Sequence, residues 1–300
     1  MGEVPANTTV RTVGAATVHA RSTLVASLLR RAALNAILIG LSLVALVPLL
    51  WMLVTSLKVS GAEYDWPPQW IPNPIVWENY IKAHSALNYG AYYRNTATIC
   101  VLSAIGATLT SSMAAFAFAR IRFDGRNFVF ALLLSTMMLP GIVTLIPTFV
   151  IFRTVGWIDT LLPLVVPSWL GGGAFYIFLI RQFFMTIPVE LDESARIDGA
   201  SSLRIYWQIL MPLAGPAVAV VAVFTFVDHW TEFLAPLIYL NSDSMRTVAL
   251  GIAMNRGFYA VKLNYMMAAS MVMSLPIIVL FFAAQRYFIR GIVLTGFAGR

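Results

Sequence analysis

A dense run of charge in this 300-residue chain lies between Pro188 and Gly199. Pro188 is tolerated in the first turn of a helix, where its missing N–H group would have no partner in any case. Glu190, Asp192 and Glu193 follow it, and the helix dipole favours negative charge at that place. Gly199 fits the end of the same helix, because glycine readily adopts the left-handed conformation that stops a helix. The spacing predicts a short acidic helix whose side chains suit docking to a partner.

A second short helix is predicted directly after Gly199. Either Ser201 or Ser202 can cap its start, because a serine hydroxyl accepts a hydrogen bond from the first free N–H groups of a helix. Apolar positions recur at helical spacing and predict one apolar face: Leu203, Tyr206, Trp207 and Leu210. A plain connector needs neither caps nor such a face, so the pair of helices favours docking to a partner or to the membrane surface.

A second group of polar residues lies at the end of an apolar run. Asp228 and Glu232 are four positions apart and would share one face of a helix. Ionisable residues in a membrane segment are candidates for function. Together with Trp230 they could line a polar substrate path. They could also relay protons, or face water at the outer end of the run, and the sequence leaves these alternatives open.

Several common chemistries have no signature in the sequence. No Gly-x-x-x-x-Gly-Lys-Ser/Thr motif is present, so the chain carries no recognisable ATP site of its own. His19, His84 and His229 are scattered, and Cys100 lies alone in an apolar run, so no metal site is expected. No Gly-x-Ser-x-Gly nucleophile elbow occurs either. We therefore expect no catalytic residue and no cofactor bound by this chain.

The composition is that of a protein whose solvent is largely lipid. Hydrophobic residues make up 59% of the chain and charged residues 11%, whereas a soluble domain carries about 25% charged residues. The mean hydropathy is +0.80. The net charge of +7 is explained by basic residues at the cytoplasmic ends of membrane spans, and no nucleic-acid partner is expected.

Six apolar stretches are long enough to cross a bilayer, which takes about 20 helical residues. They are residues 33–57, 95–119, 128–152, 161–183, 213–238 and 265–289. The predicted fold class is an all-α membrane protein with about six transmembrane helices and the docking helix between the fourth and the fifth. The expected domains are a tail of residues 1–32, a six-span domain of residues 33–290 with the docking loop at 186–212, and a tail of residues 291–300.

Basic residues predict the orientation of the chain. Arg120, Arg122 and Arg126 gather in one short loop, whereas the loop after the next span has Arg153 alone. Cytoplasmic loops carry the excess of arginine and lysine, so both termini and the docking loop are expected in the cytoplasm. The first apolar run is too long for the apolar core of a cleavable signal peptide, which takes about 7–15 residues, and is expected to be retained.

Prolines and glycines interrupt several predicted spans, notably Pro140 with Gly141 in the third and the run Gly171–Gly173 in the fourth. In lipid such breaks persist only where neighbouring helices or a wet cavity satisfy the freed backbone groups. Two interpretations remain open for them: bends beside a translocation path, or ordinary packing of helices through small residues.

The docking loop also resembles a known family. Glu193-Ser-Ala-Arg-Ile-Asp-Gly-Ala200, followed by Ile209-Leu-Met-Pro212, is similar to the EAA motif in the permease subunits of binding-protein-dependent ABC importers. The family pattern is Glu-Ala-Ala, two residues, Asp-Gly-Ala, and a helical stretch that ends near Leu-Pro. Ser194 stands where alanine is usual, and Met211 where leucine is usual.

The resemblance extends over nearly the whole chain. Residues 228–237 are similar to the sugar-permease pattern Trp-Asn-x-Phe-x-x-Pro-Leu, with Thr231 in place of the asparagine. Residues 285–300 resemble the tail of maltose-permease G-type subunits, and the usual final Lys-Gly is Gly299-Arg300 here. Together these motifs resemble those of the carbohydrate branch of the family.

This resemblance implies a function and a set of partners. The chain would be a transmembrane permease subunit of a prokaryotic inner-membrane importer for a sugar or related polyol. It would pair with a second homologous permease, two ATPase subunits that bind ATP and Mg, and an extracytoplasmic solute-binding protein. The docking helix would be the coupling helix that sits in a cleft of the ATPase. The residues that would carry the coupling are Glu193, Ser194, Ala195, Asp198, Gly199 and Ala200.

Two alternatives remain. One is an ABC permease for a solute other than a sugar. The other is an ion-coupled secondary transporter, which would need charges along its path and often shows internal repeats. Only the pair Asp228 and Glu232 supports that second alternative.

Overall fold

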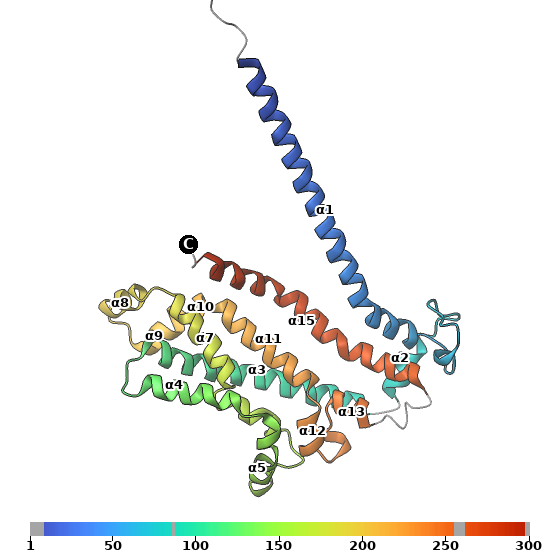
Figure 1. The fold of residues 1–300 in the computed structure, drawn as a ribbon. Helices are drawn as coiled ribbons and strands as arrows, with labels where there is room; N and C mark the ends of the chain where they lie inside the picture. Colours follow the sequence, from blue (N-terminus) through green and yellow to red (C-terminus); the bar gives the residue numbers. More distant parts are fainter. Residues whose placement is uncertain (1–8, 86–87, 255–261, 298–300) are drawn as a thin grey trace, which may run out of the picture. The chain divides into compact units, whose positions relative to one another are not determined.

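The computed structural model describes residues 9–85, 88–254 and 262–297. Within these residues every regular element is a helix, and no strand is present (Figure 1). The chain divides into two compact units, Met1–Val54 and Thr55–Arg300. The predicted all-α architecture is confirmed.

The first unit is most of α1 (Thr9–Ser56), a helix of 48 residues. Its segment Leu28–Ser56 is apolar enough to cross a membrane, with a mean hydropathy of 2.7. Because α1 begins at Thr9, the backbone of the expected tail, residues 1–32, is helical from residue 9 onward. No break in the helix separates that part of the tail from the first span.

Within the described residues, four helical segments could cross a membrane by length and composition, and the number rises to six if each of two bent helix pairs is one span. The four are Leu28–Ser56, Tyr89–Arg120, Leu162–Thr186 and Leu263–Gln285. They coincide with the first, second, fourth and sixth predicted spans. The architecture is thus that of a membrane protein with about six spans, two of them bent.

The second and sixth spans are long helices, and the fourth is assembled from shorter pieces. The long helices are α3 (Tyr89–Arg120) and α15 (Leu263–Phe297). The pieces are α6 (Leu162–Val165), η3 (Val166–Trp169) and α7 (Ala174–Thr186). Gly171, Gly172 and Gly173 separate η3 from α7, and their φ angles of 104°, 65° and 128° lie in the region that favours glycine. The predicted break in this span is present.

The third predicted span, 128–152, is not one straight helix. α4 (Arg126–Ser135) runs into η2 (Thr136–Met138), and α5 (Gly141–Thr154) then leaves at an angle of 99°. Pro140 lies at the bend, where its ring fixes φ and removes a hydrogen-bond donor.

The fifth predicted span, 213–238, is wrong at its carboxyl end. α11 (Gly215–Thr231) has 17 residues, and Pro216 lies in its first turn. It is bent by 80° from the preceding helical segment Ser202–Leu213. After Thr231 the backbone becomes extended, and α12 (Leu234–Tyr239) is a separate short helix.

α3 lies at the centre of the second unit and packs against α11, α7 and η3. Small residues make this close packing possible. Gly106 lies against the ring of Trp169, and a Cβ atom added at Gly172 would lie 2.8 Å from the Cα atom of Ala107. Small residues let membrane helices approach each other closely, so the broken fourth span is held against α3.

The two ends of the second unit carry different elements (Figure 1). One end holds α8 (Glu190–Ile197), and the other holds α2 (Glu78–Ser85), η5 (Asp243–Met245) and α13 (Val248–Met254). We call them the α8 end and the α13 end. A short turn, η1 (Ala62–Tyr64), precedes α2.

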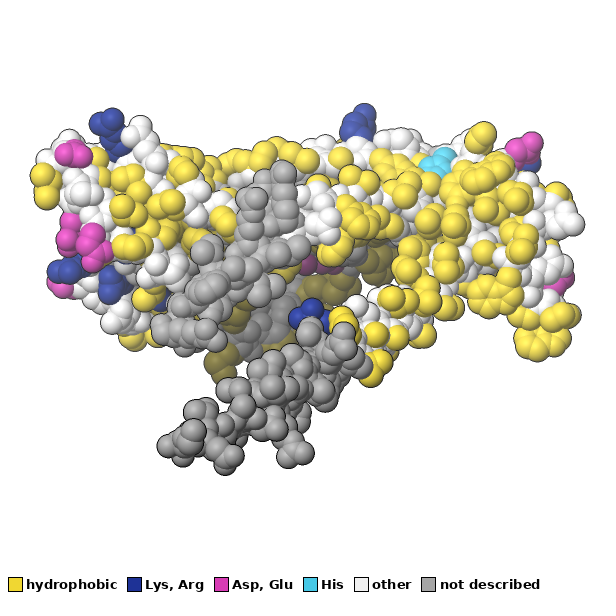
Figure 2. Space-filling model, turned by 90° about the horizontal axis from the view of Figure 1, so that it is seen from above, with side chains coloured by type: hydrophobic (Ala, Val, Ile, Leu, Met, Phe, Trp, Pro, Cys, Tyr) yellow, Lys and Arg dark blue, Asp and Glu magenta, His cyan; other side chains and the backbone are white. Residues whose placement is uncertain are grey.

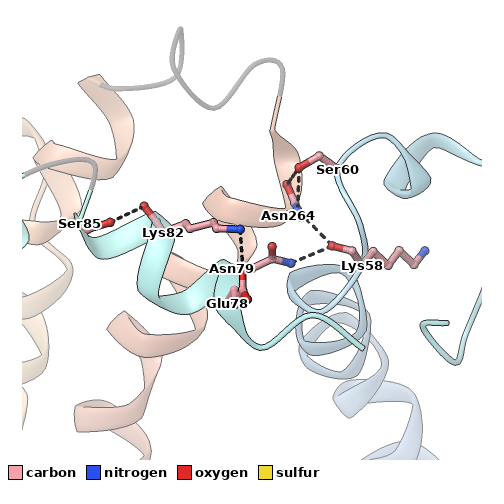
Figure 3. A network of polar contacts seen from close by, with 7 residues as sticks. All are labelled: Lys58, Ser60, Glu78, Asn79, Lys82, Ser85 and Asn264. Atoms are coloured by element: carbon pink, nitrogen blue, oxygen red, sulfur yellow. Dashed lines mark hydrogen bonds and ion pairs between the residues drawn. The ribbon is translucent and has the colours of Figure 1, made fainter. Parts of the chain in front are cut away.

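At the α13 end, buried side-chain amides join segments that are far apart in the sequence (Figure 3). Asn79 of α2 and Asn264 of α15 both donate to the carbonyl oxygen of Lys58, over 2.8 Å and 3.1 Å. Asn264 also donates to the hydroxyl of Ser60. An unpaired buried amide is costly, so these bonds hold α2 and the start of α15 to the segment at residues 58–60.

A second polar contact joins two loops. The carboxylate of Asp159, between α5 and α6, accepts hydrogen bonds from the backbone N–H groups of Asn241 and Ser242, over 2.9 Å and 2.8 Å, and from the Ser242 hydroxyl. Asp159 has a positive φ of 63°, which aspartate tolerates better than most residues. The loop after α5 is thereby tied to the loop after α12.

Hydrophobic side chains cover much of the face seen in Figure 2, and charged side chains gather toward the α8 end. Large exposed hydrophobic residues occur on most of the helices; examples are Val143, Ile146, Phe178, Val279 and Phe282. Exposed apolar surface on this scale requires lipid or another subunit as its neighbour.

Candidate functional site

The predicted acidic helix is present as α8 and ends in a Schellman motif. The N–H of Gly199 donates to the carbonyl of Arg196 over 3.0 Å, and that of Ala200 donates to the carbonyl of Ala195 over 2.9 Å. Gly199 itself has a φ of +80°. This is the hydrogen-bond pattern that a left-handed residue produces after the last turn of a helix, so the helix stop predicted at Gly199 is confirmed.

The second predicted helix is also present. Its cap is Ser201, whose hydroxyl accepts from the N–H of Arg204 over 3.3 Å. The helix consists of α9 (Ser202–Ile205), the π-helical turn η4 (Tyr206–Leu210) and α10 (Met211–Leu213).

The apolar face predicted for this second helix is only partly correct. Tyr206 and Leu210 are buried, whereas Leu203 is 60% exposed and Trp207 is 48% exposed, so the four residues do not share one face. Ile205 is buried in their place. The π-helical turn explains the difference, because hydrogen bonds from i to i+5 widen the helix and bring residues five apart onto one face.

Most of the side chains predicted to carry coupling are open to a partner. Glu193, Ser194, Asp198 and Gly199 are exposed. Ala195 and Ala200 are half-buried and pack against a hydrophobic cluster that includes Phe184 and Tyr206. Sequence reasoning missed Ile197, which is 87% exposed. Its exposure beside Asp198 makes the end of α8 amphipathic and suited to docking.

A shallow pocket lies in the angle between α8 and α9. Its lining residues are Ala195, Asp198, Ala200, Arg204, Gln208 and Ile209. The guanidinium of Arg204 donates to the amide oxygen of Gln208 over 2.8 Å, which orders one wall. The pocket thus presents a carboxylate, an ordered arginine and small apolar groups on one surface.

A buried ion pair fixes α8 to the carboxyl end of α3. Nε of Arg120 lies 3.0 Å from Oδ2 of Asp192, and Nη2 of Arg120 donates to the carbonyl of Ile187 over 2.7 Å. Burial raises the pKa of the Asp192 carboxyl, and the guanidinium of Arg120 opposes that shift. The sequence analysis did not predict this contact. The sequence offers only one indication of it, which is that Arg120 ends a span and an acidic helix follows later in the chain.

Asp228, Trp230 and Glu232, the second group of candidate residues, make three different kinds of contact in the structure. Asp228, on α11, accepts a hydrogen bond from the hydroxyl of Tyr176 over 2.7 Å. Trp230 is buried, and its indole N–H donates to the carbonyl of Met273 over 2.9 Å. Glu232 accepts from the N–H of Leu234 over 2.8 Å and thus caps α12.

The prediction that Asp228 and Glu232 share a helical face is therefore wrong. α11 ends at Thr231, and Glu232 has extended backbone angles. The residues that do gather beside Asp228 are others. Tyr176 comes from α7, and His229 approaches the hydroxyl of Ser168 at 3.3 Å. Tyr176 and Ser168 lie far from Asp228 in the sequence, so the sequence did not predict that they come together.

Among the residues that the structure describes, no group of three His, Cys, Asp or Glu side chains could hold a metal ion. The arrangement as a whole is a helical membrane protein with an exposed, rigidly capped acidic helix at one end.

Comparison with known proteins identifies the class. Residues 106–294, well over half of the chain, match the family described as binding-protein-dependent transport system inner membrane component. The chain belongs to this family and is an inner-membrane transport subunit.

Named relatives cover most of the chain. It is 32% identical over 265 residues to the sn-glycerol-3-phosphate transport system permease protein UgpE of Yersinia pestis, covering 86% of this chain and 93% of that one. It is 31% identical over 229 residues to the arabinooligosaccharides transport system permease protein AraQ of Halalkalibacterium halodurans, covering 76% and 81%. It is 30% identical over 255 residues to the diacetylchitobiose uptake system permease protein NgcG of Streptomyces coelicolor, covering 84% of each.

Solved structures share the fold. A chain of a bacterial ABC transporter involved in the import of the acidic polysaccharide alginate matches with a TM-score of 0.73 and 23% identity, over 85% of this chain and 95% of that one. A chain of an alginate ABC transporter in complex with an alginate-bound periplasmic protein matches with a TM-score of 0.62 and 17% identity, over 84% and 92%.

Proposed function

We propose that this chain is the permease subunit of an ATP-driven importer that moves a sugar or related polyol delivered by a solute-binding protein. The observation that carries the proposal is the exposed, Schellman-capped helix α8 in a member of the binding-protein-dependent transport family. The relatives named for arabinooligosaccharides and diacetylchitobiose support the carbohydrate class.

In this proposal α8 is the surface through which the energy of ATP reaches the membrane domain. Glu193, Ser194, Asp198 and Gly199 would face an ATPase subunit, with Ala195 and Ala200 fixing the helix to the permease core. The ATP and Mg would be bound by two such ATPases, and a second homologous permease would cover part of the exposed apolar surface. The solute-binding protein would dock from the other side of the membrane.

In the proposed topology α8 lies in the cytoplasm. The two predicted tails, residues 1–32 and 291–300, lie there as well. The α13 end would then face the solute-binding protein. The excess of arginine near the carboxyl end of α3, at Arg120, Arg122 and Arg126, supports this orientation.

Asp228 is the proposed contact to substrate. A carboxylate exposed on a membrane helix is costly toward lipid, and a sugar offers hydroxyl donors to it. In this proposal Trp230 and Glu232 support the structure beside the substrate path and do not contact substrate. The indole of Trp230 is buried, and the carboxylate of Glu232 caps α12. We expect Asp228→Asn, which keeps an acceptor for Tyr176, to lower uptake by about fivefold or more through a raised KM, since hydrogen bonds to charged groups contribute about 1.5–3 kcal/mol.

The matched control for Asp228→Asn is Glu232→Gln, which retains an oxygen able to cap α12. Uptake that depends on a proton gradient in the wild-type protein and loses that dependence in Asp228→Asn would instead support a proton relay. An unchanged KM in Asp228→Asn would remove Asp228 from the path.

A second candidate substrate class is favoured by one relative. UgpE is named for sn-glycerol-3-phosphate, so a phosphorylated polyol is the alternative to an uncharged sugar. The decisive experiment purifies the tagged chain gently from its own membranes and identifies its companions and the bound ligand by mass spectrometry. Recovery of an ATPase, a second permease and a sugar-loaded binding protein supports the proposal, and a chain that transports alone without ATP contradicts it.

A further inference from the structure

The guanidinium of Arg120 contacts two segments that follow α3 by many residues. Arg120 is the last residue of α3. Its Nη2 atom reaches the carbonyl of Ile187, the residue that follows α7, and its Nε atom pairs with Asp192 in the first turn of α8. A single side chain therefore joins the ends of two membrane spans and the exposed helix that follows them.

This pair is buried. The side chains of Arg120 and Asp192 are only 8% and 5% exposed, whereas the pair of Lys82 and Glu78 at the α13 end is 53% and 70% exposed. An exposed pair contributes little to stability because water and salt screen it. A buried pair is different, because loss of one partner leaves the other charge buried and unpaired. Loss of either Arg120 or Asp192 should therefore cost more than loss of a partner in the exposed pair.

The place of the pair in the fold gives it a further consequence. α3 packs against α7, α11 and η3, so it is the central helix of the second unit. The peptide chain alone would attach α8 to α7 only through residues 187–189. A second arginine strengthens the same corner, since Arg181 of α7 donates to the carbonyl of Phe118 over 3.2 Å.

We infer that Arg120 and Asp192 are positioning residues that make α8 move as one body with α3 and α7. A displacement of α8 by a docked ATPase would then be transmitted directly to the central helix, and a displacement of α3 would be transmitted back. This inference rests on the proposed function for its transport consequence, but the attachment of α8 can be measured without it.

The test uses a graded set of variants. Arg120→Met with Asp192→Leu removes both charges and retains apolar volume, and such double replacements of buried pairs are often well tolerated. Asp192→Asn removes one charge and keeps an acceptor. Arg120→Lys keeps a charge but loses the fork that serves two acceptors at once. Arg122→Met, an exposed arginine two residues further on, is the control.

The first readout is hydrogen exchange of the α8 amides in the purified chain. We expect Asp192→Asn, which leaves the charge of Arg120 buried without its partner, to lose protection in α8 at least several-fold. The double variant should lose less, and Arg122→Met and the centre of α3 should keep their protection. Unchanged protection of α8 in both variants would overturn the inference. This readout does not depend on transport, so it remains decisive even if the proposed function fails.

The second readout is substrate uptake per ATP hydrolysed in proteoliposomes that contain the assembled complex. We expect the ratio to fall by about fivefold or more in Asp192→Asn, which is the lower end of typical coupling between sites, and by less in the double variant and in Arg120→Lys. A purely structural role would lower the melting temperature without changing this ratio, and that result would overturn the inference. A wild-type complex that shows no ATP-dependent uptake would contradict the proposed function instead.

Discussion

At the residue scale, the backbone angle of Gly199 restricts which residues can occupy the position, although no neighbouring atom does. A Cβ atom added there would meet nothing within 4 Å, yet φ is +80°. The position therefore excludes other residues through conformation rather than through space, because a left-handed angle costs an L-residue about 1–2 kcal/mol.

We expect Gly199→Val to unwind the end of α8 and to uncouple ATP hydrolysis from transport, while Gly199→Asn is milder because asparagine tolerates the left-handed region. The measurement is uptake and ATPase activity of the reconstituted complex. Wild-type uptake by a fully assembled Gly199→Val complex would show that the conformation of this residue is not needed for coupling.

Ile197 is the residue whose exposure most directly suggests docking. It is 87% exposed on the same short helix as Glu193. Truncation of a well-packed apolar anchor at an interface costs more than about 1 kcal/mol. We expect Ile197→Ser to weaken association with the ATPase about fivefold or more, as measured by titration of the detergent-solubilised permease with the ATPase.

Ile71→Ser is the matched control for that experiment. Ile71 is also a highly exposed isoleucine, but it lies in the segment that precedes α2 at the α13 end. Equal affinities of the two variants for the ATPase would exclude Ile197 from the docking surface.

At this scale, the features that the sequence predicted are local ones. The glycine stop and the serine cap each involve residues at most five positions apart, and both are present. Arg120 and Asp192 are 72 positions apart in the sequence (192 − 120), so their contact is seen only in the folded chain. Asp228 and Glu232 do not share a helical face for a local reason, since the helix ends one residue before Glu232.

At the scale of elements, the loops at the α13 end depend on the carboxylate of Asp159. Its bond from the Ser242 hydroxyl, together with those from two backbone N–H groups, holds the pKa of Asp159 below its ordinary value of 3.8. A group whose pKa is lowered by folding adds stability above the ordinary pKa, and that stability is lost as the pH falls through the lowered value. The contact is thus intact at neutral pH.

We expect the protection factors of the Asn241 and Ser242 amides to fall when the pH is lowered from 7 toward 3, as measured by hydrogen exchange with correction for intrinsic rates. Asp159→Asn is the control, because asparagine tolerates a positive φ but does not titrate. Protection that is the same at both pH values in the wild-type protein would contradict this role of the carboxylate.

Elements themselves were predicted with mixed success. Long apolar runs predicted the first, second, fourth and sixth spans correctly, because a run of about 20 apolar residues is long enough to cross a bilayer as a helix. The sequence did not predict how sharply the chain bends at Pro140 and after Leu213, where the angles are 99° and 80°. The direction of a helix after a proline depends on the helices packed around it. The π-helical turn at Tyr206–Leu210 was not predicted either, and it separates apolar residues that helical spacing had placed on one face.

At the scale of the whole molecule, the proposed topology is the property with the clearest test. The single native cysteine, Cys100, is buried, so it gives little background labelling. We expect a cysteine placed at Pro5 or Ser194 to resist an impermeant thiol reagent on intact cells, and one placed at Ile71 to react. Labelling of either of the first two before the membrane is opened would reverse the orientation.

The three glycines that interrupt the fourth span also set a limit on how the protein can change over generations. Each has a positive φ angle, and Gly172 is further confined by Ala107. Replacement of any one would strain the chain, while the other two would still keep the span from becoming a continuous helix. We therefore expect a single substitution at any of the three to lower the stability of the protein without producing an unbroken span.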